Sequence, residues 1–395
     1  MELRIAHTAD IHLDSRVTID GEIVRNPDGE NIRWRDRQRC FAAFVDDAIR
    51  RDCDLAVVAG DLFETARPTP AEYLVANWYL DRLAKVMPVV LIGGNHDDPS
   101  GLAERHAVEP ILGRRENLYV STRPELLTIR LMGGQTVLVG TLPSPKKSAL
   151  LTREEIATLP PEQVNAMISG KLAAVLRGLH GKVPEGEASI LVAHVMVIGA
   201  DFGGADDTAT RISIALHPDD LNGWDYVALG DIHKAQGFGF RGWYSGSLDR
   251  ADFGEEHESK GWNLVTLSGP AHTATVERVP TPARRFLTLS AEDLQDEARM
   301  QELFREPVDS VPVLRVKGTI TLEAYEAIRP TIALWERLPT FADKLTVTRA
   351  TRTRNENLTD TLGPKPALSM WAEQNGHQDK LAALFAEHDR IAAAA

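Results

Sequence analysis

Five polar motifs, each placed directly after a short apolar run, constrain the fold of this chain more than any other feature. The motifs are Asp10-Ile11-His12, Gly60-Asp61, Gly94-Asn95-His96-Asp97, His194 and Gly230-Asp231-Ile232-His233. Short apolar runs bounded by turn residues are typical of buried strands. Sites in open α/β sheets form at the carboxyl ends of strands. The pattern therefore predicts an α/β fold in which the five motifs meet along one edge.

The segments around these motifs alternate between strand-like and helix-like patterns. The apolar runs 3–9, 54–59, 88–92, 189–193 and 225–229 indicate buried strands, and 35–50 and 70–86 indicate amphipathic helices. Segments 118–142 and 262–279 indicate further strands, which we expect to be antiparallel. After a Pro- and Arg-rich stretch at 280–285, residues 286–350 predict a small α+β domain, with strands in 311–322 and helices in 323–338. Residues 367–394 predict one or two helices, broken around Asn375-Gly376.

The residue types in the motifs are those that bind divalent metal ions. Asp, His and Asn suit Mn, Fe, Zn or Mg rather than soft metals. Asp10 and His12 are two residues apart, so both point to one face of an extended backbone, and Asp231 and His233 repeat this spacing. Taken singly, Asp10-Ile11-His12, Gly60-Asp61 and His194 are more often a helix cap, a loop start or a buried histidine, whereas Gly94-Asn95-His96-Asp97 fits a structural and a functional role equally. The ordered set of five favours a metal site over these structural explanations.

Charge and cysteine content limit the class of protein. The chain has 44 Lys+Arg and 57 Asp+Glu, and the net charge of −13 argues against a DNA-binding protein, whose surface is usually basic, unless part of the acidic residues serve as ligands. Two cysteines exclude a disulfide scaffold and a Cys-rich zinc module. No apolar run approaches the ~18–20 residues of a membrane span. We therefore expect a soluble protein of the cytoplasm, with no membrane partner.

With these motifs in view, the chain resembles the calcineurin-like metallophosphoesterases and, among them, the SbcD-type DNA repair nucleases. The stretches that carry the resemblance are HTADIHLD, VVAGDLFE, IGGNHDDP, DYVALGDIHKAQ, YSGSLDRADFGEEHESKGW and PTPARRF. The resemblance implies a four-layer α/β/β/α sandwich with a small α+β capping domain and C-terminal helices. It implies a nuclease domain at 1–280, the capping domain at 281–354 and partner-binding helices at 355–395.

The resemblance also implies a site for two metal ions. One metal would be held by Asp10, His12, Asp61 and His233, and the second by Asp61, Asn95, His194 and Asp231, with Asp61 shared. His96 and Asp97 are then the candidate catalytic residues, and His96 would contact the phosphate or protonate the leaving group. Asp231 departs from the family's usual G-H-x-H pattern, and a carboxylate there favours harder metals. The expected cofactor is Mn²⁺, with Mg²⁺ or Fe²⁺ as alternatives.

The activity that the resemblance implies is hydrolysis of phosphodiester bonds in DNA during double-strand break repair. It would comprise a 3′→5′ exonuclease on duplex ends and an endonuclease on single strands or hairpins. Two alternatives stay open. A phosphodiesterase or phosphatase acting on a small molecule or lipid would share the same metal ligands. A non-catalytic protein that binds DNA is suggested by Asp231.

Partners are implied as well: DNA, an SbcC-type coiled-coil ABC ATPase and a second copy of the chain, in a nucleoid-associated cytoplasmic complex. The DNA-binding candidates are Arg33, Arg35, Arg284 and Arg285, with the basic stretch 349–354, because guanidinium groups contact phosphates. The candidate anchors for the ATPase are Trp371, Leu381, Leu384 and Phe385, because apolar and aromatic side chains dominate such contacts. Helices 35–50 and 70–86 are the candidates for the dimer contact.

Overall fold

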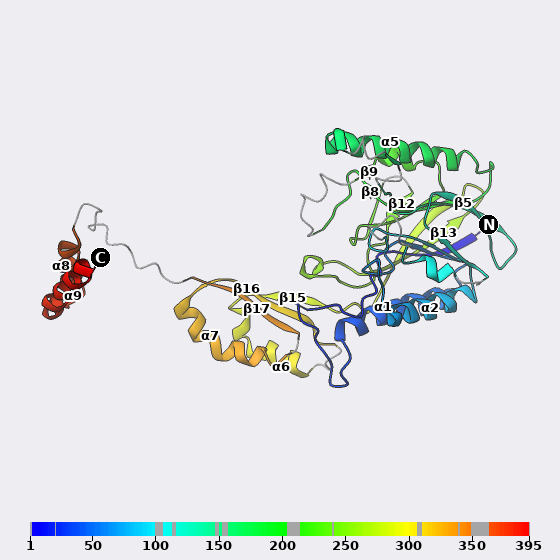
Figure 1. Cartoon of the computed structure of the whole chain (residues 1–395). Helices are drawn as coiled ribbons and strands as arrows, with labels where there is room; N and C mark the ends of the chain where they lie inside the picture. Colours follow the sequence, from blue (N-terminus) through cyan, green and yellow to red (C-terminus); the bar gives the residue numbers. More distant parts are fainter. Residues whose placement is uncertain are drawn as a thin grey trace.

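Two six-stranded mixed sheets form the centre of the fold (Figure 1). The computed structural model describes residues 2–19, 21–98, 106–112, 116–146, 150–151, 157–203, 214–238, 241–305, 310–338, 340–348 and 363–394. The first sheet has the strand order β14-β13-β1-β2-β3-β4. Its parallel strands are β1 (Glu2–Thr8), β2 (Leu55–Ala59), β3 (Val89–Ile92) and β4 (Leu118–Ser121). Strand β13 (Gly261–Ser268) is antiparallel to β1, and β14 (Thr273–Pro280) is antiparallel to β13.

The second sheet has the order β11-β12-β10-β7-β6-β5. Its strands are β5 (Glu125–Arg130), β6 (Thr136–Leu142), β7 (Ser189–His194), β10 (Tyr226–Gly230), β11 (Gln236–Gly237) and β12 (Gly242–Tyr244). β5 and β6 are antiparallel, as the sequence predicts for this segment. The expectation is wrong for β4, which pairs in parallel with β3 and so belongs to the other sheet. A short parallel pair, β8 (Met196–Val197) and β9 (Ala215–Leu216), lies outside both sheets.

Side-chain alternation along the strands builds four layers. In β2, Leu55, Val57 and Ala59 belong to the core between the sheets, whereas Ala56 and Val58 belong to the core beneath the helices α1 and α2. The second sheet alternates in the same way, with its outer face packed on α5 (Pro161–His180). Successive residues of a strand point to opposite faces, so an apolar run without alternation is buried on both. The predicted α/β/β/α sandwich is confirmed.

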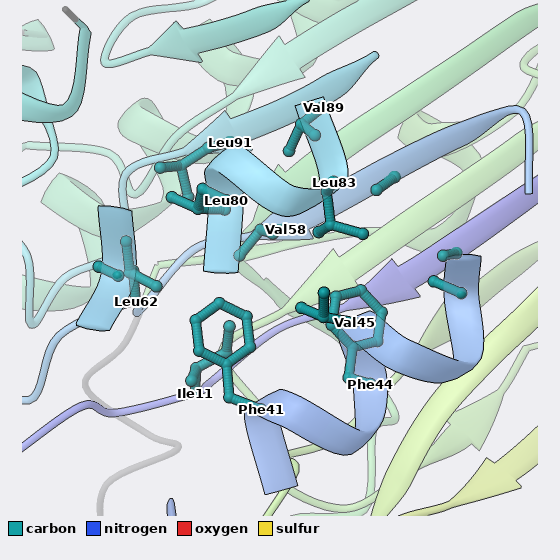
Figure 2. Packing of buried hydrophobic residues seen from close by; sticks show 14 of the residues in the cluster. Ile11, Phe41, Phe44, Val45, Val58, Leu62, Leu80, Leu83, Val89 and Leu91 are labelled. Carbon is teal, nitrogen blue, oxygen red and sulfur yellow. The ribbon is translucent and has the colours of Figure 1, made fainter. Parts of the chain in front are cut away.

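The helices α1 (Ile32–Arg50) and α2 (Pro70–Ala84) cover the first sheet (Figure 2). Asn31 begins α1 by accepting the amides of Arg33 and Trp34, which starts the helix three residues earlier than the sequence predicts. A capping box of Thr69 and Glu72, with Pro70 in the first turn, begins α2. Apolar side chains such as Phe41 and Leu80 fill the space between these helices and the sheet.

A second unit follows the sandwich and has a core of its own. It consists of β15 (Phe286–Leu289), α6 (Glu297–Arg305), β16 (Val313–Thr321), α7 (Leu322–Trp335) and β17 (Phe341–Thr348), and we call it the cap unit. Its three strands form a parallel sheet in the order β15-β16-β17. Trp335 is fully buried among apolar side chains of this unit alone. The boundaries 1–280, 281–354 and 355–395 stay predictions.

Two helices, α8 (Pro364–Gln374) and α9 (Leu381–Ala394), follow the cap unit and pack on each other (Figure 1). The break expected at Asn375-Gly376 is observed, with Gly376 in the left-handed region (φ +68°). Cys40 and Cys53 are buried, free thiols. Among the described residues, no helix has the length and apolar character needed to cross a membrane.

Candidate metal centre

The chain turns sharply where it leaves the central strands, and this brings the predicted motifs together. Asp10, His12, Asp61 and Asp231 all have positive φ, at 51°, 51°, 50° and 98°. Non-glycine residues rarely adopt this conformation, which costs about 1–3 kcal/mol each and is concentrated at functional sites. The amides of Asp10 and His12 are bound by the carbonyls of Gly60 and Asp61, so the turns after β1 and β2 brace each other.

Two glycines allow the motifs to approach so closely. A Cβ on Gly94 would lie 2.0 Å from Oδ1 of Asp61, and a Cβ on Gly230 would lie 2.0 Å from the carbonyl oxygen of Ala59. Real Cβ atoms do not come this near to other heavy atoms, so both positions require glycine. The two sheets therefore meet almost backbone to backbone beneath the site.

Three overlapping groups of potential metal ligands lie at this edge. They are Asp10, His12 and His233; His12, Asp61 and His96; and Asp10, Asp61 and His194, with the ligand atoms of each group within 4.8 Å of one another. Most of these side chains are buried, and His194 is 1% exposed. Asp10, His12 and Asp61 each belong to two groups, so the three sets form one continuous centre.

The hydrogen-bond partners of the histidines indicate that this centre suits a cation. Nδ1 of His194 donates to the carbonyl of Ala59 over 2.8 Å, which leaves the lone pair on Nε2. That Nε2 faces Oδ1 of Asn95 at 2.8 Å, Oδ2 of Asp61 at 3.4 Å and Oδ1 of Asp231 at 3.6 Å. Acceptors that converge in this way need a shared cation or a proton.

The pKa of His194 reports the same crowding of acceptors. Burial by itself would lower this pKa, but the charges of Asp61 and Asp231 raise it well above the usual value. Burial also raises the pKa of Asp231 to about 6, assisted by the neighbouring carboxylates of Asp10 and Asp61. A divalent cation would relieve both effects, so the residues present fit the metals expected for the site.

His12 and His233 face each other in the same manner. Their Nε2 atoms are 3.0 Å apart. Nδ1 of His233 is 2.6 Å from Oε1 of Glu255, and Nδ1 of His12 is 3.3 Å from Oε2 of Glu64. The hydrogen bond to Glu255 fixes the proton of His233 on Nδ1 and leaves its Nε2 free to act as a ligand atom, an arrangement common around metal-binding histidines, and the Glu64 carboxylate lies beside Nδ1 of His12.

Glu64 and Glu255 are the site residues that sequence reasoning missed. Both lie within the quoted motifs VVAGDLFE and DFGEEHESKGW, but nothing in their spacing marks them as partners of histidines. Glu64 also accepts a hydrogen bond from Arg37 over 3.2 Å. Hydrogen bonding to His12 and the charges of His12 and Arg37 lower the pKa of Glu64 to about 2, although burial opposes this shift.

The two candidate catalytic residues have different surroundings. His96 lies beside His12, its side chain is 40% exposed, and its amide donates to Oδ1 of Asp61 over 2.9 Å. Asp97 is fully buried, and its carboxylate accepts the amides of Leu62, Phe63 and Gly94. These hydrogen bonds hold two site loops together, and the catalytic role of Asp97 stays a prediction.

The arginines predicted to bind DNA divide into two classes. Arg33 and Arg284 are 1% and 3% exposed, and both guanidinium groups bind the carboxylate of Asp36. The prediction is corrected for these two, since a phosphate could not reach them. Arg285 is exposed, and Arg35 is 3.6 Å from Glu30, with its side chain 48% exposed. The basic stretch 349–354 lies outside the described residues.

The candidate anchors in the C-terminal helices are partly accessible. Trp371 is 37% exposed, while Leu381, Leu384 and Phe385 are half-buried. Lys365 lies over the ring of Phe385 at 5.7 Å. Their role in binding a partner stays a prediction.

A match to a protein-family model identifies the family of this chain. Residues 3–235, which include all five motifs, match the model of the calcineurin-like phosphoesterases. The chain belongs to this family. Members of the calcineurin-like phosphoesterase family depend on divalent metals, which agrees with the ligand groups described above.

Curated relatives lie among DNA repair proteins and nucleases. The chain is 26% identical over 320 residues to the DNA double-strand break repair protein Mre11 of Methanosarcina acetivorans, covering 79% of this chain and 44% of that protein. It is 25% identical over 351 residues to the SbcD component of the SbcCD nuclease of Escherichia coli, covering 85% and 83%. The SbcD component of Staphylococcus epidermidis is 26% identical over 276 residues, covering 67% and 66%. The chain thus spans less than half the length of its Mre11 relative.

Proposed function

We propose that this protein is a metal-dependent nuclease that hydrolyses phosphodiester bonds in DNA during double-strand break repair. The observation that carries the proposal is the convergence of histidine lone pairs and carboxylates at one sheet edge, above all His12 facing His233 and His194 facing Asp61. The relatives named as Mre11 and as the SbcD component of the SbcCD nuclease support DNA as the substrate.

Two divalent cations, most favourably Mn²⁺, complete the proposed site. Asp10, His12, Asp61 and His233 would hold one, and Asp61, Asn95, His194 and Asp231 the other. Such a pair would supply positive charge opposite the phosphate oxygens and would make a nearby water more acidic. Carboxylates and imidazoles together suit Mn²⁺, and Mg²⁺ or Fe²⁺ would fit the same ligand set.

His96 is the proposed proton donor to the leaving oxygen. Its Nδ1 is 2.9 Å from the carbonyl oxygen of Glu64, to which it donates, so Nε2 is the atom left to face substrate. The amide of His96 is bound to Asp61, which ties its position to that of the shared ligand. General acid catalysis of this kind contributes about 10²–10⁴-fold to a rate.

The proposal includes the finer activities and partners that the resemblance implies. These are a 3′→5′ exonuclease on duplex ends, an endonuclease on single strands and hairpins, a homodimer, and an SbcC-type ATPase that controls access to duplex DNA. The cap unit and the helices α8 and α9 lie beyond the family match at residues 3–235 and support a large substrate and a protein partner. The proposed location is the nucleoid-associated cytoplasm.

A cleavage assay on hairpin and linear DNA with Mn²⁺ tests the proposal. We expect Asp61→Ala to abolish cleavage and His96→Ala to reduce it by about 10²–10⁴-fold with little change in metal binding. Arg299→Ala, which removes an exposed ion pair with Asp293 in the cap unit, is the matched control and retains full activity. Equal rates in wild type and Asp61→Ala would contradict the proposal.

The same assay separates the alternatives. Hydrolysis of bis(p-nitrophenyl) phosphate without any cleavage of DNA would favour a small-molecule phosphodiesterase. DNA binding with neither activity would favour the non-catalytic alternative.

A further inference from the structure

One segment of the chain contacts both the metal centre and the cap unit. It runs from Asp249 to Lys260, between β12 and β13, and contains the single-turn helix η4 (Phe253–Glu255). We call it the bridging segment. Residues of η4 and its flank contact the metal centre and the cap unit in turn. A shift of the segment on the cap side would therefore also move the residues that contact the metal centre.

On the metal side, the bridging segment holds His233 by both side chain and backbone. Oε1 of Glu255 binds Nδ1 of His233 over 2.6 Å. Lys260 donates to the carbonyl oxygen of His233 over 3.2 Å and lies 2.8 Å from Oε2 of Glu255. Glu255 and Lys260 are 9% and 3% exposed, so this arrangement is built into the interior.

On the side of the cap unit, neighbours of Glu255 contact its first two strands, β15 and β16. The ring of Phe253 packs edge-on against Phe286 of β15, with centroids 4.9 Å apart, and Arg315 of β16 lies over Phe253 at 4.2 Å. Glu256 accepts both the amide and the hydroxyl of Thr288 in β15, over 2.8 and 2.6 Å. These contacts join β15 and β16 directly to η4 and its flank.

The base of the segment is fixed to the sandwich. The buried guanidinium of Arg33 on α1 binds Asp249 over 2.8 Å and the carbonyl of Arg250 over 2.6 Å. Arg250 in turn donates to the carbonyl of Glu255 over 3.1 Å and to that of Arg284 over 3.0 Å. The base of the segment is therefore anchored to the sandwich, and Arg250 connects this anchor to η4.

We propose that the bridging segment couples the position of the cap unit to the orientation of the metal ligand His233, with Glu255 as the positioning residue. A displaced cap unit pulls Phe253 and Glu256, turns Glu255, and releases the imidazole from the orientation in which Nε2 faces His12. Substrate that repositions the cap unit thereby adjusts the metal centre. The inference rests on the proposed function in that His233 binds a metal there.

Linkage makes the coupling measurable without any nuclease assay. If the cap position changes metal affinity, then metal binding must stabilise the cap contact by the same factor. Isothermal titration calorimetry measures how the cap contact affects Mn²⁺ affinity. Hydrogen exchange of β15 measures how Mn²⁺ binding affects the cap contact. Both use the full chain with Mn²⁺ alone.

The first test compares Mn²⁺ affinity among variants. We expect Glu255→Gln to weaken one Mn²⁺ site by about 10–100-fold, the usual effect of losing a partner of a metal-binding histidine. Phe253→Ala, which touches no ligand, should weaken the same site by about two- to thirtyfold. Thr288→Val changes only the cap side, and it should act in the same direction if Phe253→Ala fails to fold. Arg299→Ala, on the cap unit but away from η4, is the control and leaves the affinity unchanged.

The second test measures the reciprocal effect, that of Mn²⁺ binding on the stability of the cap contact. Mn²⁺ should slow hydrogen exchange of residues 286–289 in wild type and have a smaller effect in Glu255→Gln. Wild-type Mn²⁺ affinity in folded Phe253→Ala and Thr288→Val, or equal protection of β15 in Glu255→Gln, would overturn the coupling while leaving the proposed nuclease intact. Failure of the wild type to bind Mn²⁺ would overturn both.

Discussion

At the scale of single residues, the proposed ligand that departs from the family pattern, Asp231, is the most informative. Oδ1 of Asp231 lies 3.6 Å from Nε2 of His194, and the amide of Asp231 donates to Oδ1 of Asp10 over 3.1 Å. Three carboxylates, from Asp10, Asp61 and Asp231, therefore surround His194. This excess of negative oxygen ligands favours hard cations over soft ones.

We predict that Asp231→His shifts the metal preference of the protein. Replacing the carboxylate by an imidazole removes one negative charge, so Mg²⁺ affinity falls while Zn²⁺ affinity rises. Titration calorimetry with Mg²⁺, Mn²⁺ and Zn²⁺ measures the change, and the fold is checked by thermal melting. An unchanged ratio of Zn²⁺ to Mg²⁺ affinity would show that residue 231 does not contribute a ligand.

The residues that sequence could predict are those whose role follows from position after a strand. Asp10, His12, Asp61, His194 and His233 each follow an apolar run and converge as expected. Glu64 and Glu255 were not predicted because tertiary contacts set their partners. Glu255 pairs with His233 and Glu64 lies beside His12, and in each case the two residues are far apart in the sequence. The buried arginines were predicted to bind DNA because the sequence does not show their partners. In the folded interior, Asp36 and Asp249 neutralise Arg33.

At the scale of elements, the close approach of the two sheets determines the site. Strands β2 and β10 belong to different sheets, yet a Cβ on Gly230 would lie 2.0 Å from the carbonyl of Ala59 and 2.9 Å from Cβ of Ala9. Backbone atoms on both sides leave no flexible group to move aside. The strand ends can therefore hold their ligands together only while residue 230 lacks a side chain.

We predict that Gly230→Ala destabilises the protein by about 1–3 kcal/mol, the usual cost of overpacking a core. Gly170→Ala is the matched control, because nothing lies within 4 Å of its added Cβ on the exposed side of α5. That substitution should instead stabilise by up to ~1 kcal/mol through helix propensity. Urea unfolding measures both, and equal stability of the two variants would contradict the packing argument.

Strand identity was predictable from apolar runs, but strand partners were not. The run that became β4 has the composition of an antiparallel strand beside β5, yet it joins β3 in the first sheet. A turn of only three residues, 122–124, carries the chain from β4 in one sheet to β5 in the other. A sequence pattern shows which faces of a strand are buried, but not which strand is its neighbour. Both sheets have apolar buried faces, so the pattern could not assign β4 to one of them.

At the scale of the whole molecule, α2 presents an apolar surface. Leu74 and Trp78 are 71% and 66% exposed and lie one helical turn apart. This is the helix predicted to contribute to the dimer contact, and exposed large apolar groups in adjacent positions mark interaction sites. The surface thus supports the proposed homodimer.

We predict that the double variant Leu74→Glu/Trp78→Glu is a monomer under conditions in which the wild type is a dimer, because two buried charges would oppose the contact. Light scattering coupled to size exclusion gives the mass. Met132→Glu, at a similarly exposed apolar position in the turn between β5 and β6, is the control and leaves the mass unchanged. A double variant with wild-type mass would exclude α2 from the interface.

The last prediction concerns recruitment of the proposed ATPase. The net charge of −13 opposes unguided approach to DNA, so a partner that supplies DNA contacts would compensate for it. Helices α8 and α9 form a pair with Trp371 exposed on its surface, and the ligand groups of the metal centre include none of its residues. Deleting 363–395 should therefore abolish binding of an SbcC-type ATPase and spare cleavage of single-stranded DNA. Trp371→Glu should weaken the same binding about tenfold or more, as for a central aromatic anchor. Pull-down and cleavage assays on the same preparations decide the matter, since retained ATPase binding by the deletion would place the docking surface elsewhere.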